Sequence, residues 1–255
     1  MRFDGKHVLV TGASRGIGRA VAEAFGSAGA RLTILADDPV ITQAAQEIAR
    51  VSAAQVAPVQ CDIADRTAVQ AALSELDTID VLVNNAGLER LTPIRTSGLA
   101  VLDTYARIID INVNGSFWVT HAALPHMKRG GRIIFTASIW GKSVEAEFAA
   151  YCASKHAVIG LMRVLAKELG PDGISVNAVC PGWVRTEASM RSLHIMAERS
   201  GRPEPELLDE IVGGQAMDGL MEPKDIVGPY LFLASDAAAN ITGQALNIDR
   251  GEVMI

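Results

Sequence analysis

The chain has 255 residues, of which 23 are basic and 29 acidic, so its formal net charge at pH 7 is −6. This charge argues against a basic surface that binds nucleic acid. Hydrophobic residues make up 49% of the chain, which argues against long disordered segments.

Short apolar runs alternate with stretches of helical periodicity along the whole chain. The first run, 7–10, is followed by glycines and by a helix predicted over 19–27. The second run, 32–35, precedes a helix that we expect to begin at Asp38-Pro39, because the pair offers a capping side chain and a proline at the first helical position. Further strands are predicted at 56–59, 81–83, 132–135, 176–179 and 245–248. The alternation predicts right-handed βαβ units in a parallel sheet with helices on both faces.

One region, residues 186–221, is irregular. It contains Gly201, Pro203, Pro205, Gly213, Gly214 and Gly219, and short helices are predicted at 194–199 and 206–212. A mobile segment that follows a strand can cover a site at the sheet edge, so we predict a substrate lid. The alternative is a surface excursion with no role. Because no linker or repeat divides the chain, we expect one domain over 1–255.

Several features exclude other classes of protein. The three cysteines form no CxxC pair and the five histidines form no pair on one helical face, so we expect no disulfide framework and no metal site. This cysteine usage favours a reducing, cytoplasmic setting. We expect no signal peptide. The sequence also lacks an apolar run of about 18 residues, so we expect no membrane span.

A glycine-rich turn, Thr11-Gly12-Ala13-Ser14-Arg15-Gly16-Ile17-Gly18, lies between the first strand and its helix. Glycines let the backbone approach a pyrophosphate, and the helix N-terminus supplies amide donors and a favourable dipole. The spacing is GxxxGxG rather than GxGxxG, and glycines alone also serve ordinary tight turns. In this strand–turn–helix context the pattern predicts dinucleotide binding.

Charged residues near the end of the second strand bear on which dinucleotide is bound. An acid about 20 residues after the glycines accepts hydrogen bonds from the adenosine 2′-hydroxyl. Asp37 and Asp38 lie there, and both would repel a 2′-phosphate. Arg15 favours the opposite choice because a guanidinium pairs with phosphate. The sequence favours NAD through Asp37 and does not exclude NADP.

Tyr151 and Lys155 are four residues apart, so on a helix they share one face. A nearby cation favours the phenolate, which would bring the pKa of Tyr151 from about 10 toward working pH. Tyr151 is therefore a candidate general acid/base for an alcohol or carbonyl. Ser138 follows a predicted strand, so we expect its hydroxyl at the carboxyl edge of the sheet.

Six motifs occur in order along the chain: TGASRGIG at 11–18, NNAG at 84–87, Ile111-Asn112, Ser138, YCASK at 151–155 and PG at 181–182. Together they resemble the short-chain dehydrogenase/reductase (SDR) family over essentially the whole length. The resemblance implies an α/β fold with a Rossmann-type doubly wound parallel sheet of about seven strands. It also implies a nicotinamide cofactor, hydride transfer to or from an alcohol carbon, and a homotetramer.

The resemblance also implies residue roles. Tyr151 matches the catalytic acid/base, and Lys155 matches the residue that lowers its pKa and binds the nicotinamide ribose. Ser138 would hold the substrate oxygen, and Asn112 would position a water for proton relay. The matches to cofactor-binding positions are Gly12, Arg15, Ile17, Gly18, Asp62, Asn85, Ala86, Gly87, Pro181, Gly182, Val184 and Thr186. Asp62 can also be read as a plain turn aspartate.

Two positions depart from the family pattern. Family members that prefer NAD usually carry their acid one position before Asp37, where this chain has Ala36. This weakens the expectation of NAD without supporting NADP, because no basic residue stands there. Arg250 replaces a glycine near the C-terminus, where family subunits often meet, and its consequence for assembly is open.

Polar side chains cluster in the sequence around the predicted substrate end. We expect Ser138, Trp140, Glu145, Tyr151 and Trp183 to contact substrate. Other candidates are Glu89, Arg90, Ser143, Glu147, Arg191 and His194. So many hydrogen-bonding groups favour a small hydroxylated substrate, such as a sugar, sugar acid or polyol, over a steroid. The alternatives are an NADPH-dependent 3-oxoacyl thioester reductase and a catalytically silent nucleotide-binding sensor.

Overall fold

The computed structural model describes all 255 residues and contains one sheet of seven strands. Its order is β3-β2-β1-β4-β5-β6-β7, and every neighbouring pair is parallel. The strands are β1 (His7–Thr11), β2 (Arg31–Ala36), β3 (Val56–Gln60), β4 (Ile79–Asn84), β5 (Met127–Thr136), β6 (Ser175–Pro181) and β7 (Ala245–Ile248). All seven predicted strands are confirmed, as is the parallel sheet.

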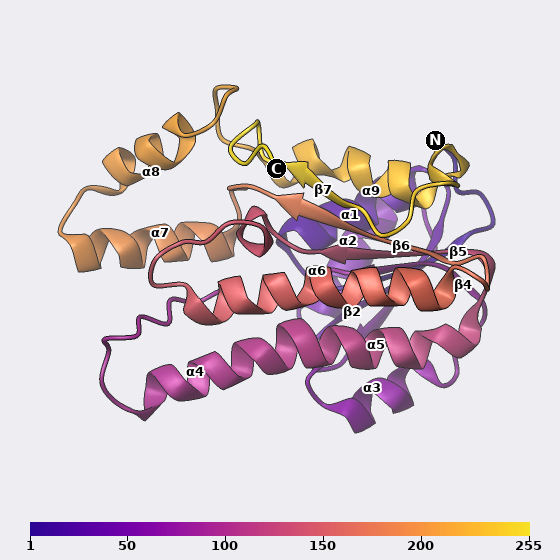
Figure 1. Ribbon diagram of the computed structural model, residues 1–255. Helices are drawn as coiled ribbons and strands as arrows, with labels where there is room; N and C mark the ends of the chain where they lie inside the picture. Colours follow the sequence, from indigo (N-terminus) through magenta and orange to yellow (C-terminus); the bar gives the residue numbers. More distant parts are fainter.

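The helices cover both faces of this sheet (Figure 1). They are α1 (Gly16–Ser27), α2 (Ile41–Ser52), α3 (Arg66–Leu73), α4 (Leu99–Ile109), α5 (Ser116–Ala123), α6 (Ala149–Leu169), α7 (Glu187–Ser200), α8 (Glu204–Gly213) and α9 (Val227–Ala234). A core of 25 buried residues lies between the sheet and α3, α5 and α6, and a second core of 24 lies between the sheet and α1, α2 and α9. The two cores are nearly equal in size, so the doubly wound arrangement is confirmed.

Two predicted helix starts were wrong. Helix α1 begins at Gly16 rather than at residue 19, so its first turn is part of the glycine-rich segment. Helix α2 begins at Ile41, with Val40 in the capping position. Asp38 lies two residues before that position, where one carboxylate oxygen accepts a hydrogen bond from the Val40 amide (2.9 Å) and the other forms an ion pair with Arg15.

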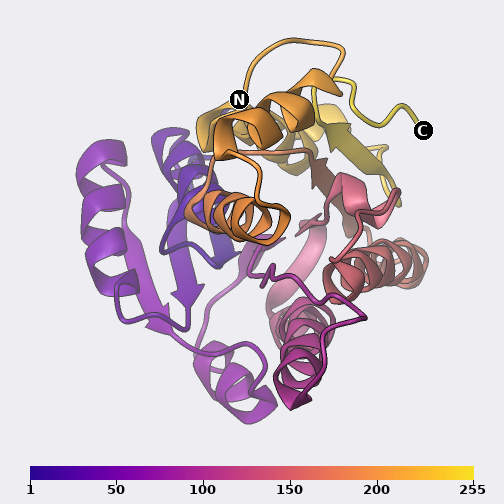
Figure 2. The same ribbon diagram turned by 90° about the vertical axis from the view of Figure 1, so that its left-hand side faces the viewer.

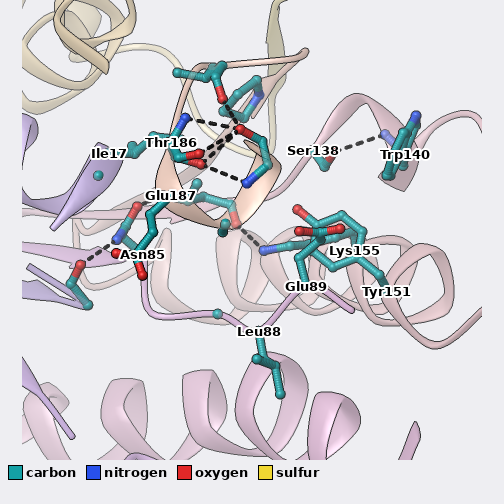
Figure 3. A pocket seen from close by; sticks show the side chains of 18 of the residues that line it. Ile17, Asn85, Leu88, Glu89, Ser138, Trp140, Tyr151, Lys155, Thr186 and Glu187 are labelled. Atoms are coloured by element: carbon teal, nitrogen blue, oxygen red, sulfur yellow. Dashed lines mark hydrogen bonds between the residues drawn. The ribbon is translucent and has the colours of Figure 1, made fainter. Parts of the chain in front are cut away.

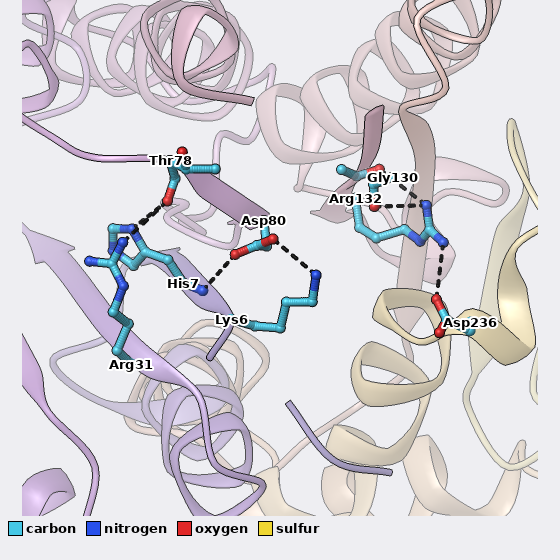
Figure 4. A network of polar contacts seen from close by, with 9 residues as sticks. Lys6, His7, Arg31, Thr78, Asp80, Gly130, Arg132 and Asp236 are labelled. Carbon is cyan, nitrogen blue, oxygen red and sulfur yellow. Dashed lines mark hydrogen bonds and ion pairs between the residues drawn. The ribbon is translucent and has the colours of Figure 1, made fainter. Parts of the chain in front are cut away.

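The amino ends of the central strands are closed by polar contacts (Figure 4). Asp80 accepts a hydrogen bond from the amide of His7 (2.9 Å) and pairs with Lys6 (3.1 Å). On the neighbouring β5, Arg132 donates to the backbone oxygen of Gly130 (3.0 Å). These contacts engage the charged side chains at this end of the sheet, while the Nε of Arg132 stays buried without a partner.

Residues 186–221 form α7 and α8, which extend beyond the carboxyl ends of the strands (Figures 1 and 2). The predicted pieces 194–199 and 206–212 are the inner parts of these longer helices. Thr186 begins α7, because its hydroxyl accepts from the Ser189 amide and the Ser189 hydroxyl accepts from the Thr186 amide. A short bridge between Val184 and Met221 closes the base of the segment. No helix of the structure is long and apolar enough to cross a membrane.

Candidate active site

A cavity of about 830 Å³ lies among the loops that leave the carboxyl ends of the strands and helices α7 and α8. This is where open α/β sheets bind ligands. The predicted site residues that line it are Gly12, Arg15, Ile17, Asp37, Asp62, Asn85, Ala86, Gly87, Ser138, Trp140, Glu145, Tyr151, Lys155, Pro181, Gly182, Trp183, Val184 and Thr186. Two predicted residues, Gly18 and Asn112, are not part of the lining and support it from behind.

The turn after β1 packs directly against the turn after β4. The side-chain amide of Asn85 donates hydrogen bonds to the backbone oxygens of Thr11 (3.1 Å) and Gly12 (3.2 Å). A Cβ at Gly12 would lie 2.6 Å from Cα of Ala86, and a Cβ at Gly18 would collide with the Asn85 amide. Gly12 also has a φ of +65°. Both glycines are therefore required for this close approach.

The N-terminus of α1 is the part of the cavity wall that suits a diphosphate. Its capping residue, Arg15, makes no side-chain hydrogen bond to the helix, and the first turn carries no acidic residue. The first amides of a helix lack intrahelical partners and carry the positive end of the helix dipole. Since Gly16 and Ile17 also line the cavity, the donor set fits the pyrophosphate of a dinucleotide.

Arg15 connects three separate elements at this end of the cavity. Its guanidinium pairs with Asp38, which follows β2, and with Glu187 (3.0 Å), at the start of α7. Asp37, by contrast, is exposed and lines the cavity. Of the two neighbouring acids, Asp38 is engaged by Arg15 and Asp37 is not.

Asp62 lines the same end of the cavity and also forms a turn. One oxygen of its carboxylate accepts a hydrogen bond from the amide of Ala64 (3.0 Å), and the other pairs with Arg107 of α4 (2.6 Å). The two interpretations of Asp62, a turn residue and a residue facing the cofactor, are therefore compatible.

Tyr151 and Lys155 lie one turn apart on α6 and both face the cavity (Figure 3). The Lys155 ammonium is 5.4 Å from the centre of the Tyr151 ring and donates a hydrogen bond to the backbone oxygen of Thr136 (2.8 Å). The Ser138 hydroxyl, which follows β5, accepts a hydrogen bond from the Trp140 amide (3.1 Å). Phenol, ammonium and serine hydroxyl are thus brought to one wall, as their sequence positions predicted.

The electrostatics of this wall differ from our expectation. Burial raises the pKa of the Tyr151 phenol, the negative charge of Glu89 raises it further, and hydrogen bonding with Ser138 opposes them. Burial also lowers the pKa of Lys155 to about 8. Burial and the charge of Glu89 thus act against the lowering of the tyrosine pKa that Lys155 is expected to cause, and that lowering stays a prediction.

Asn112 lies in a short π-helical stretch, Asp110–Gly115, and is buried behind the cavity. Its side-chain oxygen accepts from the amide of Leu88 (2.7 Å), and its nitrogen donates to the backbone oxygen of Leu88 (3.0 Å) and to Ser154 (2.9 Å). Asn112 therefore fixes the loop after β4 against α6, which sets the position of that loop beside Lys155.

Two tryptophans form the wall opposite the glycine turn. The ring of Trp140 meets Tyr151 edge-on (6.0 Å between centroids) and Trp183 likewise (6.3 Å). The Trp183 indole nitrogen is buried without a hydrogen-bond partner. Glu145 lines the cavity here, and burial raises the pKa of its carboxyl.

Some substrate candidates do not reach this cavity. His194 pairs with Glu204 (2.7 Å) at an exposed position, and Glu147 pairs with Arg199 (2.6 Å). The Ser143 hydroxyl donates to the backbone oxygen of Ile139 (3.0 Å). These three candidates do not line the cavity, whereas Glu89, Arg90 and Arg191 do.

Two residues that act through contacts between distant segments, Thr136 and Tyr230, were not predicted. Thr136 supplies the acceptor for Lys155, and its hydroxyl bonds to Tyr230 of α9 (2.8 Å) and to Asn85 (3.2 Å). A threonine at a strand end and a tyrosine in an apolar helix carry no local signal of such a role.

The chain matches known proteins along its whole length. A family model described as enoyl-(acyl carrier protein) reductase matches residues 12–252. A sorbitol dehydrogenase from Cereibacter sphaeroides is 36% identical over 265 residues, which cover 100% of both chains.

Solved structures agree with this match. A short-chain dehydrogenase from Burkholderia cenocepacia, in complex with NADP, has a TM-score of 0.85 and 31% identity, with 99% of both chains covered. A 3-oxoacyl-[acyl-carrier protein] reductase from Brucella melitensis, with bound NAD, has a TM-score of 0.86 and 31% identity and covers 99% of this chain and 92% of its own.

Proposed function

The chain belongs to the short-chain dehydrogenase/reductase family, and from this membership we propose that it is an NAD(P)-dependent oxidoreductase acting on the secondary alcohol or ketone of a polyol or sugar. The observation that carries the proposal is one cavity that joins the uncapped N-terminus of α1 to the Tyr151–Lys155 wall. The first suits a pyrophosphate, and the second holds a proton donor and acceptor.

The cofactor and the substrate bind at different ends of the cavity. The cofactor-contacting residues are Gly12, Arg15, Ile17, Gly18, Asp37, Asp62, Asn85, Ala86, Gly87, Tyr151, Lys155, Pro181, Gly182, Val184 and Thr186, with Gly18 acting from behind the lining. The bound nicotinamide supplies or accepts the hydride. The proton transfer and the positioning of the substrate are carried out by the protein's own residues.

Tyr151 moves the proton at its phenol oxygen, giving it to a carbonyl or taking it from an alcohol. Ser138 holds the substrate oxygen, and Lys155 places a positive charge near the phenol. Asn112 positions the loop after β4 through its paired bonds to Leu88. A neutral phenol is the form needed to protonate a carbonyl, so the raised pKa of Tyr151 suits the reductive direction.

The cavity lining supports a hydroxylated substrate. Its substrate end carries Glu89, Arg90, Glu145 and Arg191 as well as two tryptophans. Such groups give hydrogen bonds to hydroxyls, beside the apolar side chains of Met196, Leu207 and Ile211, which also line the cavity. The similarity to a sorbitol dehydrogenase also supports a hydroxylated substrate.

A 3-oxoacyl thioester is the second candidate substrate. It is favoured by the similarity to the Brucella melitensis reductase and by the description of the matching family model. The test is a substrate panel with purified protein, with each of NAD, NADP, NADH and NADPH, followed by nicotinamide absorbance. We expect turnover of polyols or ketoses. Turnover of an acetoacetyl thioester alone would replace the proposal by the second candidate, and turnover of nothing would favour a silent sensor.

Cofactor choice within this function is NAD with NADP not excluded. Asp37 lines the adenosine end and would repel a 2′-phosphate. Arg15, the cation that could bind that phosphate, is held by Asp38 and Glu187. Both features favour NAD.

The proposal also covers the oligomeric state of the protein, the role of residues 186–221 and the cellular location. Exposed apolar side chains on α4 and α5 (Leu99, Leu102, Tyr105 and Phe117) support the homotetramer that the family resemblance implies. The single bridge at the base of 186–221 supports a lid. Three buried, unpaired cysteines support a cytoplasmic location. Light scattering tests the homotetramer, because a monomer in solution would contradict it.

A further inference from the structure

Two of the arginines that line the cavity have no carboxylate partner. The cavity arginines are Arg15, Arg90, Arg191 and Arg202. Arg15 and Arg202 each pair with two carboxylates. Arg90 hydrogen-bonds only to the backbone oxygen of Glu89 (2.8 Å), and the Arg191 Nε is buried without a partner.

Both guanidinium groups face the same cavity, and each acts electrostatically on Glu89. Burial lowers the pKa of Arg90, and the charge of Arg191 lowers it further. Half-buried like charges that face one cavity are unfavourable unless an anion joins them. Because a guanidinium stays protonated at any ordinary pH, proton loss cannot relieve this repulsion.

The pair belongs to the substrate end of the cavity. Arg90 adjoins Glu89, and Arg191 adjoins Ser192 of α7, whose hydroxyl donates to Oε1 of Glu89 (2.6 Å). Glu89 in turn acts electrostatically on Tyr151, and Figure 3 shows their side chains together. The arginines therefore flank a residue that lies beside the proton donor.

Neighbouring acids do not cancel this charge. Glu89, even fully ionised, offsets one of the two guanidinium charges and leaves one. Burial raises the pKa of Glu145 and of Glu252, the other unpaired acids at the substrate end of the lining, and the charges of Arg90 and Arg191 shift the pKa of neither. One surplus positive charge is what a carboxylate neutralises, whereas a phosphate dianion would need two.

We propose that Arg90 and Arg191 bind a carboxylate of the substrate, so that the preferred substrate is a polyhydroxy acid rather than a neutral polyol. A guanidinium holds a carboxylate through two parallel hydrogen bonds, which fixes orientation as well as charge. The acid end then lies against α7, and a secondary alcohol of the chain faces Tyr151. This inference rests on the proposed function, because it names the substrate class of the same site.

The test compares compounds that differ only at one end. D-Gluconate and D-galactonate are paired with sorbitol and galactitol, in which a CH₂OH group replaces the carboxylate, and sorbitol 6-phosphate is the phosphate control. The readouts are kcat/KM with the preferred nicotinamide and, independently, binding to the protein–cofactor complex through tryptophan fluorescence. The second readout is available because Trp140 and Trp183 line the cavity.

Variants then assign the preference to the two arginines. We expect wild type to favour an aldonate over its polyol by about 10- to 100-fold, the range for hydrogen bonds to a charged group. Arg90→Gln and Arg191→Gln should each remove most of this ratio through KM, and Arg191→Lys should restore part of it. Arg199→Gln, which removes an exposed arginine of the same helix, should leave the ratio unchanged.

Each possible outcome of these experiments either supports or overturns the inference. Polyol turnover with no aldonate preference, or an equal preference in the glutamine variants, overturns the inference and leaves the proposed function standing. A preference for sorbitol 6-phosphate overturns the carboxylate assignment. If no compound is turned over, the proposed function fails. Fluorescence then still decides the inference, because aldonate binding that is lost in Arg191→Gln supports it and absent binding overturns it.

Discussion

Lys155 donates a hydrogen bond of 2.8 Å from its ammonium to the backbone oxygen of Thr136, at the end of β5. This bond ties the catalytic face of α6 to the edge of the sheet. It also holds the lysine where only 4% of its surface is exposed, within 5.4 Å of the Tyr151 ring centre. Placing the Lys155 ammonium beside Tyr151 therefore requires that a charged group be buried away from water.

Lys155→Met should change how stability depends on pH. Burial lowers the lysine pKa from its ordinary 10.5 to about 8 in the folded protein. Between these values the unfolded chain holds a proton that the folded chain has lost, so this group makes wild type more stable as pH rises. The stability of wild type relative to Lys155→Met should rise by up to about 3 kcal/mol from pH 7 to pH 11.

Urea unfolding of both proteins at several pH values measures that difference. Lys142→Met is the control, because Lys142 also donates to a backbone oxygen, that of Ala245 (2.7 Å), but from a half-buried position. A stability difference for Lys155→Met that stays flat with pH would show that the ammonium is not desolvated.

Asn112→Ala should loosen the loop after β4. The substitution removes both bonds to Leu88 and the bond to Ser154 in a buried setting, so we expect a loss of about 2–3 kcal/mol in unfolding free energy. We also expect a lower kcat, because the loop lies beside Lys155. Asn114→Ala, two residues on, loses only an exposed bond to Asp110 and should behave like wild type. Equal effects of the two variants would refute a positioning role for Asn112.

Asp37→Ser should relax discrimination against NADP. Removing a like charge from the adenosine end should raise the ratio of kcat/KM for NADP over NAD by about tenfold, the effect of roughly 1.4 kcal/mol. Asp38→Ser is the companion variant, since it removes one of the two carboxylates that hold Arg15 without changing the lining acid. If only Asp38→Ser shifts the ratio, the discriminating residue is Arg15 and not Asp37.

Gly18→Ala should destabilise the protein and weaken cofactor binding together. The new Cβ would meet the Asn85 amide and the backbone oxygen of Gly12, so the two turns have to separate, at about 1–3 kcal/mol. Gly160→Ala, on the exposed face of α6 with nothing within 4 Å of the new Cβ, should instead stabilise by about 0.5–1 kcal/mol. Thermal unfolding and nucleotide titration compare the two. Wild-type behaviour of Gly18→Ala would contradict the close packing.

The sheet could be predicted from the sequence because each strand is a local apolar run. Periodicity also predicted helices between the strands, and the predicted starts of α1 and α2 differ from those of the structure. Helix α2 begins three residues after Asp38, which accepts from the Val40 amide through one carboxylate oxygen and pairs with Arg15 through the other. The ion pair joins segments that lie apart in the sequence, so no local pattern indicates it.

For the site, the motifs predicted which residues take part but not the direction in which their pKa values shift. Tyr151 and Lys155 share a face because of helical spacing, as predicted. The direction of the tyrosine pKa could not be predicted, because it depends on burial and on Glu89, which reaches this wall from the loop after β4. Likewise, nothing local distinguishes His194, which faces solvent, from Arg191, three residues earlier, which faces the cavity.

The most direct test of the account is hydride transfer by Tyr151→Phe. Only the phenol oxygen is removed, so we expect unchanged nucleotide binding and a fall in kcat of at least about 100-fold, the usual share of general acid–base catalysis. Tyr105→Phe, an exposed tyrosine on α4, is the control and should keep full activity. Turnover near the wild-type rate in Tyr151→Phe, with nucleotide bound normally, would contradict the assignment of the proton donor and with it the proposed chemistry.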